Sequence, residues 1–71
     1  MSWNYRAFKV IPKNSPKCAY YCIKEFYTLL GRKGWTEDAI APTGETKKEL
    51  IEVLERMLKD AKQYRARVEW I

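Results

Sequence analysis

The sequence predicts a small α+β protein in which a three-stranded antiparallel meander is followed by one long C-terminal helix packed on one face of the sheet. Two observations support this β-β-β-α order. Aromatic and β-branched residues dominate the first half of the chain, between turns rich in Gly, Pro, Asn and Ser. The second half carries one amphipathic pattern of helical period, introduced by Thr46-Lys-Lys-Glu49. A length of 71 residues predicts a single domain over 1–71.

Three strands are expected in the first half of the chain. Residues 3–11 form the first candidate, ended by Pro12, and residues 18–29 form the second and longest. The segment Gly31-Arg-Lys-Gly34 is expected to close a hairpin, because glycine adopts the positive φ angles that tight turns require. A shorter third strand follows over residues 35–40. Short loops between consecutive strands predict the antiparallel order.

The helix is expected over residues 46–65. In the capping box, the Thr46 hydroxyl and the Glu49 carboxylate satisfy each other's free backbone N–H groups. An apolar stripe follows at helical spacing, made by Leu50, Val53, Leu54, Met57, Leu58, Ala61 and Tyr64. Two structures are open for residues 66–71. The helix continues with a coiled-coil-like seam, or a short final strand forms in which Ala66, Val68 and Trp70 alternate with Arg67, Glu69 and Ile71.

The composition argues against catalysis. The chain has no His, so the commonest general base near neutral pH is missing. Ser2 and Ser15 have no base placed to activate them. We therefore expect no enzyme and no cofactor. No stretch approaches the ~20 apolar residues of a membrane helix, and the N-terminus has no leader-like apolar core, so a cytoplasmic protein without membrane contact is expected.

The two cysteines, Cys18 and Cys22, cannot fill a four-ligand zinc site without carboxylates, so no metal is expected. On a strand their Cα atoms are about 13 Å apart, farther than the roughly 7 Å that a disulfide allows. Buried or half-buried structural thiols in a reducing cytoplasm are the expectation.

The aromatic residues favour a binding role. Ten aromatics in 71 residues, spread over both faces of the expected sheet, are more than one helix can cover. The chain is therefore expected to self-associate as a two-fold homodimer, through the aromatic sheet surface or through the helix seam. The candidate interface residues are Trp3, Tyr5, Tyr20, Tyr27, Trp35 and Tyr64.

The basic residues supply an alternative function. The net charge is +5, and residues 1–34 hold seven Lys and Arg against Glu25 alone. Bases interleaved with aromatics on a sheet can neutralise phosphates and stack nucleobases, so this half is a candidate nucleic-acid-binding module or a surface for an acidic protein. The alternative without a binding function is that these lysines form a solvated surface that keeps the sheet edges from aggregating. Arg6 is also expected to pair with Glu25 across the first two strands. The candidate contacts are Arg6, Lys9, Lys24, Arg32 and Lys33.

Two resemblances add to these expectations. One set of motifs resembles a group of small uncharacterised bacterial proteins: Trp3-Asn-Tyr-Arg6, Ile23-Lys-Glu-x-Tyr27, Gly34-Trp-Thr-Glu-Asp38, Ala41-Pro-x-Gly-Glu45, and Glu49-Leu with Leu54-Glu-x-Met-Leu58. This resemblance covers most of residues 3–61 and implies a bacterial origin without an activity. It ends near Lys62, and residues 29–33 depart from the acidic, glycine-containing turn of that group.

The second resemblance concerns architecture alone. Strands followed by Gly-Glu-Thr-x-x-Glu-Leu at residues 44–50 are similar to Hic-type antitoxins, which neutralise an RNA-cleaving toxin. The Pro/Gly-rich connection and the appended DNA-binding segment of those proteins are not matched. Together the resemblances imply a non-enzymatic bacterial interaction domain, an accessory protein of mobile or stress-related genes.

Overall fold

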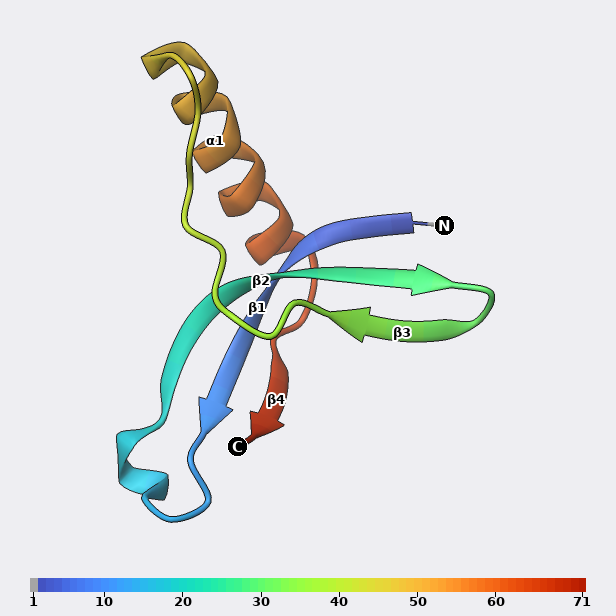
Figure 1. The fold of residues 1–71 in the computed structure, drawn as a ribbon, viewed down its shortest axis with the longest axis vertical. Helices are drawn as coiled ribbons and strands as arrows, with labels where there is room; N and C mark the ends of the chain where they lie inside the picture. The colour runs from blue at the N-terminus through green and yellow to red at the C-terminus, as the bar shows by residue number, and fades with distance from the viewer. Residues whose placement is uncertain (1) are drawn as a thin grey trace.

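The computed structural model describes residues 2–71 and shows an α+β chain (Figure 1). The described elements are β1 (Ser2–Ile11), the 3-10 helix η1 (Pro16–Cys18), β2 (Tyr20–Leu29), β3 (Arg32–Trp35), α1 (Lys47–Gln63) and β4 (Arg67–Trp70). They form one sheet of order β3-β2-β1-β4, in which β4 is parallel to β1 and the other pairs are antiparallel. The α+β prediction is confirmed, but the described sheet has four strands instead of three.

The extra strand is the C-terminal segment, for which helix and strand were both open. β4 pairs with Phe8–Ile11 of β1. Helix α1 ends at Gln63, two residues before its predicted end, and Tyr64 already has the extended backbone angles φ −108° and ψ 146°. The chain therefore leaves the helix directly into a strand. Helix α1 is the crossover from β3 to β4, at opposite edges of the sheet. β4 runs in the same direction as β3, and therefore as β1, because β2 is antiparallel to both β1 and β3.

The middle strands differ from their predicted bounds. β2 begins at Tyr20, because Pro16–Cys18 forms a 3-10 helix whose first residue has the fixed φ of proline. The hairpin turn is made by Leu30 and Gly31, whose φ angles of 51° and 79° suit a two-residue type I′ turn. β3 therefore covers Arg32–Trp35, where a turn had been predicted. Only the first residue of the segment predicted as the third strand belongs to β3, although the backbone N–H groups of Thr36 and Ile40 still donate hydrogen bonds to carbonyls of β2.

The sheet is strongly curled, and its concave face encloses the core. β1 and β2 both bend near their middle (Figure 1). The buried side chains of Phe8, Val10 and Phe26 share the concave face, with Cys22 and Trp35 packed against them. β3 pairs with one end of β2 and β4 with the C-terminal end of β1, so the curl brings the two edge strands towards each other.

Helix α1 lies beside the outer edge of β1, and the prediction that it packs across one face of the sheet is wrong. Among the described strands, only β1 contacts it extensively. The Asp60 carboxylate accepts a hydrogen bond from the backbone N–H of Tyr5 at 3.0 Å, a donor that points away from β2. Met57 and Asp60 are the buried residues of α1. The N-terminal turns of the helix project away from the sheet (Figure 1).

The start of α1 confirms half of the capping box. The Thr46 hydroxyl accepts a hydrogen bond from the Glu49 backbone N–H at 3.1 Å, as predicted. The Glu49 carboxylate accepts from the backbone N–H of Glu45 at 2.9 Å, one residue earlier than the capping box requires.

Candidate interaction surfaces

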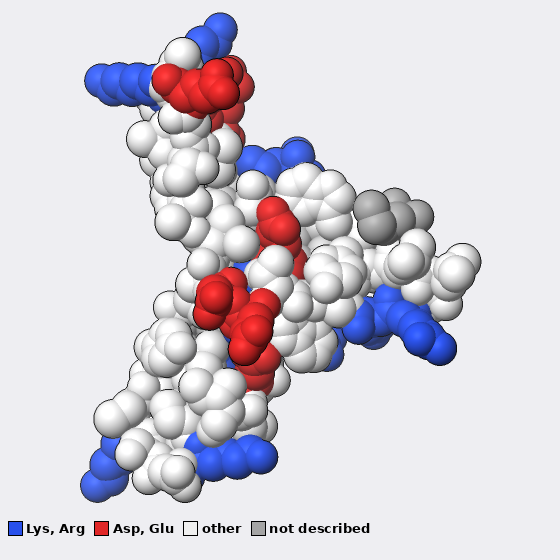
Figure 2. Space-filling view, in the orientation of Figure 1, with Lys and Arg blue, Asp and Glu red and all other residues white. Residues whose placement is uncertain are grey.

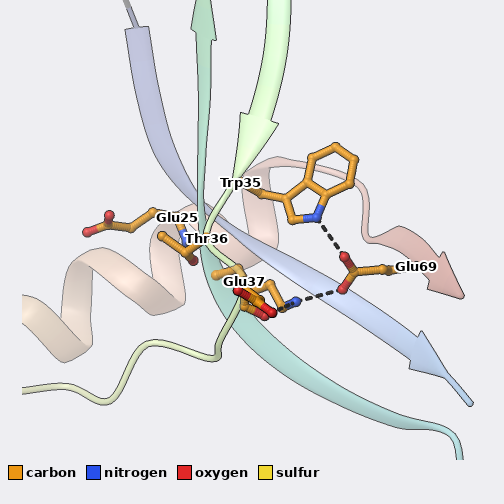
Figure 3. Close-up of polar contacts among 6 residues, drawn as sticks. Glu25, Trp35, Thr36, Glu37 and Glu69 are labelled. Carbon is orange, nitrogen blue, oxygen red and sulfur yellow. Dashed lines mark hydrogen bonds and ion pairs between the residues drawn. The ribbon is translucent and has the colours of Figure 1, made fainter. Parts of the chain in front are cut away.

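Three side chains connect the opposite edges of the curled sheet (Figure 3). The Glu69 carboxylate on β4 accepts hydrogen bonds from the Trp35 indole on β3 at 2.7 Å and from the Lys24 ammonium on β2 at 2.6 Å. Lys24 also donates to the backbone carbonyl of Glu37 at 2.7 Å. Lys24 is only 4% exposed, so it is not available as the partner contact that was predicted. Its ammonium group is instead used within the chain, in the ion pair with Glu69 and the hydrogen bond to Glu37.

The environment of Glu69 favours its ionised form. Hydrogen bonds from Lys24 and then from Trp35 lower the pKa of the Glu69 carboxyl below its ordinary value of 4.5, against the opposing effect of burial. The ion pair with Lys24 is therefore formed at neutral pH.

Arg6 and Glu25 do not pair, contrary to prediction. In the register of β1 and β2, Glu25 lies opposite Tyr5 and Arg6 lies opposite Lys24. Because side chains alternate along a strand, Arg6 and Glu25 are on opposite faces of the sheet. The Arg6 guanidinium lies instead over the ring of Phe26, with its Cζ atom 4.5 Å from the ring centroid.

The other predicted basic contacts do not gather in one patch. Lys9 is half-buried on the convex face, with its ammonium 6.0 Å from the Tyr21 ring. Arg32 and Lys33 are exposed at the far end of the sheet, beside the hairpin turn, and as neighbours on β3 they point to opposite faces. Of the five predicted bases, Arg6 and Lys33 share the concave face with the buried Lys24.

The six predicted interface aromatics divide into two groups. Those with at least 40% of their surface exposed are Trp3, Tyr20 and Tyr27. Those that are half-buried within the chain are Tyr5, Trp35 and Tyr64. Tyr5 packs edge-to-face on Trp3, with ring centroids 5.3 Å apart. Two sheet aromatics that were not among the predicted residues, Tyr21 and Trp70, are 68% and 55% exposed.

A line of exposed aliphatic residues on α1 forms a second apolar surface. Ile51, Leu54 and Leu58 are 43%, 45% and 57% exposed and recur at spacings of three and four residues, which places them on one side of the helix. Figure 2 shows one face of the arm formed by α1, and this face carries little charge between the charged tip and the body of the molecule. The apolar stripe that the sequence predicted along the helix indicates this surface, because β1 covers only part of the stripe.

The whole chain is more exposed than a globular monomer of its mass. A folded monomer of 8.5 kDa should expose about 4,700 Å². This chain exposes 5722 Å². Its radius of gyration is 13.3 Å, compared with about 11 Å for a compact domain of this length. The difference in area, about 1,000 Å², is close to the roughly 800 Å² that one partner contributes to a stable interface.

The remaining polar chemistry is sparse within residues 2–71. Both cysteines are free thiols. Cys22 is half-buried as predicted, whereas Cys18 is exposed because its segment is a 3-10 helix and not a strand. The described residues hold no group of three or more His, Cys, Asp or Glu side chains arranged for a metal ion, and they enclose no pocket. Their α-helix lacks the length and apolar character needed to cross a membrane.

Comparisons of this chain with protein-family models, with curated proteins and with solved structures found no match.

Proposed function

We propose that this chain is a non-enzymatic interaction domain that acts as a two-fold symmetric homodimer, with α1 as its main contact surface. The observation that carries the proposal is the line of Ile51, Leu54 and Leu58 on a helix whose N-terminal turns project away from the sheet. The predicted setting, the bacterial cytoplasm among accessory genes, belongs to the same proposal.

The helix needs a partner for energetic reasons. Most of the stability of a protein helix comes from packing its apolar face and not from the helical propensity of its residues. Within one copy, Met57 is the buried apolar residue of α1. Ile51, Leu54 and Leu58 are already about half buried, so covering each of them with a second copy contributes roughly 0.7–1.5 kcal/mol, half of the value for complete burial. Three such side chains from each of two helices can offset the entropy lost on association.

The charges on α1 favour an antiparallel pair of helices. Its first nine residues hold three acids and two bases, while its last eight hold three bases and the buried Asp60. An antiparallel arrangement places the more acidic half of each helix beside the basic half of the other. Opposed helix dipoles add to the attraction. Such a pair is isologous, which is the commonest symmetry of soluble oligomers.

Sedimentation equilibrium tests the proposal. The wild-type chain should show about twice the mass of 8.5 kDa. Leu54→Glu should give a monomer, because it places two carboxylates at the centre of the helix pair. Leu30→Glu is the matched control, since Leu30 is a 94% exposed leucine on the hairpin turn, outside α1. It should leave the dimer intact. A monomeric wild-type chain, or a dimer that tolerates Leu54→Glu, would disprove the proposal.

A further inference from the structure

The concave face of the sheet carries two arginine side chains that have no acidic partner. The ion pairs within residues 2–71 are Lys24–Glu69 and Arg56–Asp60, so neither Arg6 on β1 nor Arg67 on β4 is neutralised. The Cζ atoms of both arginines lie over the same Phe26 ring, at 4.5 Å and 5.1 Å from its centroid. The curl of the sheet therefore brings two free positive charges close together, from positions 61 residues apart in the chain.

Each guanidinium also contacts a second aromatic ring. Arg6 lies 4.9 Å from the ring centroid of Tyr64, and Arg67 lies 5.2 Å from that of Trp35. Phe26 is buried beneath the arginines, whereas Tyr64 and Trp35 are half-buried and keep part of their surface in contact with solvent. The resulting surface, here called the arginine face, alternates aromatic rings and guanidinium groups.

The hydrogen-bonding capacity of the arginine face is largely unused. The Nε atom of Arg6 is buried without a partner, and its Nη1 atom donates only a long bond of 3.4 Å to the Arg65 carbonyl. No side-chain hydrogen bond of Arg67 is formed within the described chain. The Oδ1 atom of Asn4, on the same face, is also buried and unpartnered. Unmet charged donors are costly, and phosphate oxygens match the fork of a guanidinium.

We infer that the arginine face binds the backbone of single-stranded nucleic acid. Arg6 and Arg67 hold phosphate oxygens, and Trp35 and Tyr64 offer ring surface to unstacked bases. Single strands are favoured because bases inside a duplex cannot reach such rings. Two exposed bases extend the surface at its ends: Arg65 follows Tyr64 in the chain, and Lys33 shares the concave face with Trp35. The net charge of +5 supports association with a polyanion.

This function is separate from self-association, because the arginine face is on the sheet and the contact proposed between copies is on α1. Arg6→Gln and Arg67→Gln should therefore leave the oligomeric state unchanged, and Leu54→Glu should leave the arginines in place. The two proposals can fail independently of each other.

Fluorescence anisotropy with a dye-labelled single strand of about 12 nucleotides tests the inference. Binding should weaken steeply as salt is added, and the slope of log K against log salt should decrease by about 0.7 for each phosphate that the protein no longer neutralises. The double variant Arg6→Gln/Arg67→Gln should lower affinity by at least about tenfold and reduce this slope by about 1.4. The matched control, Lys47→Gln/Lys48→Gln, removes the same charge from the exposed start of α1 and should change affinity less than about twofold.

A measurement on the wild-type chain covers the case in which the double variant fails to fold. In ¹H–¹⁵N spectra, adding the unlabelled strand should shift the Nε–H signals of Arg6 and Arg67 and the indole signal of Trp35. The indoles of Trp3 and Trp70 lie on the convex face and should not move.

Three results would overturn the inference. One is the absence of binding at about 100 μM protein and low salt, the weak limit of non-specific binding. Another is a set of spectral shifts confined to the convex face. The third is tighter binding of polyglutamate through the same two arginines, which would assign the face to an acidic protein.

Discussion

Glu69 compensates for a lysine that the fold has buried. Lys24 is 4% exposed and lies directly across from Arg6, another positive charge, in the register of β1 and β2. Like charges in such positions repel, and a buried ammonium without a partner is strongly destabilising. The Glu69 carboxylate supplies the opposite charge and at the same time fixes the Trp35 indole. One residue of the last strand thus holds the curled sheet closed.

Acid should weaken the fold through this residue. The folded pKa of Glu69 lies below 4.5, so the unfolded chain binds its proton first as pH falls. The stability from Glu69 is complete above the unfolded pKa, and it is lost as pH drops below about 4.5 and through the folded value. The urea midpoint of the wild-type chain should therefore fall as pH is lowered through and below about 4.5.

Urea unfolding of Glu69→Gln checks this prediction. The variant should be less stable at neutral pH, and its midpoint should change less with acid, because the titrating group is gone. Glu55→Gln, at an exposed position on α1, is the matched control and should keep the wild-type profile. Equal acid sensitivity in the wild type and in Glu69→Gln would assign the effect to other carboxyls.

The roles of Lys24 and Arg6 could not be derived from their surroundings in the sequence. Lysine is usually exposed, and no residue near Lys24 indicates that it is buried. Its partner Glu69 is 45 residues away, on a segment for which the sequence left both helix and strand open. For Arg6, the predicted pairing with Glu25 failed by one position of register, and a shift of one residue moves a side chain to the other face. Arg67, the second member of the arginine face, was absent from the predicted sites because it lies on the same undecided strand.

The β2–β3 hairpin has an unfavourable residue at its turn. Leu30 adopts φ 51° and is 94% exposed, so it bears the cost of a left-handed backbone without a packing gain. Asparagine tolerates this conformation, and Asn-Gly is the preferred pair for a type I′ turn. Leu30→Asn should raise the free energy of unfolding by about 0.5–1 kcal/mol.

The neighbouring leucine provides the control for this prediction. Leu29 is half exposed but belongs to β2, where asparagine is unfavourable, so Leu29→Asn should give no gain. Both free energies can be measured by urea unfolding. A Leu30→Asn variant no more stable than the wild type would mean that the turn is relaxed with leucine.

Elements with a local signal were predictable, and those that depend on distant contacts were not. The Thr46 cap marked the beginning of α1 because capping involves neighbouring residues. No neighbouring residue marks the end of the helix, where the backbone of Tyr64 becomes extended and the chain continues into β4. Both Gly31 and Gly34 were predicted to belong to the hairpin turn, and only Gly31 does. Gly34 proved to be a strand residue against the Tyr27 ring, where an added Cβ would lie 2.5 Å from a ring atom.

The complete molecule combines a small hydrophobic core with a helix that packs extensively only against β1 among the described strands. Its buried apolar residues within 2–71 are Phe8, Val10, Phe26 and Met57. A small chain with so few buried side chains commonly depends on a staple or a partner for stability. The α+β class followed from hydrophobic periodicity, but the curl of the sheet and the position of α1 follow from contacts such as Trp35–Glu69 and Tyr5–Asp60, which join distant parts of the chain.

If a second copy covers α1, folding and association are coupled, and thermal stability depends on protein concentration. The melting temperature followed by the helical circular dichroism signal should then rise by about 5–10 °C over a hundredfold increase in concentration. Leu54→Glu should melt at a lower temperature that no longer varies with concentration, while Leu30→Glu should keep the wild-type dependence. A wild-type melting temperature independent of concentration, with full helical signal, would mean that α1 is stable with its leucines in water. Dimerisation through the helix would then have no energetic basis.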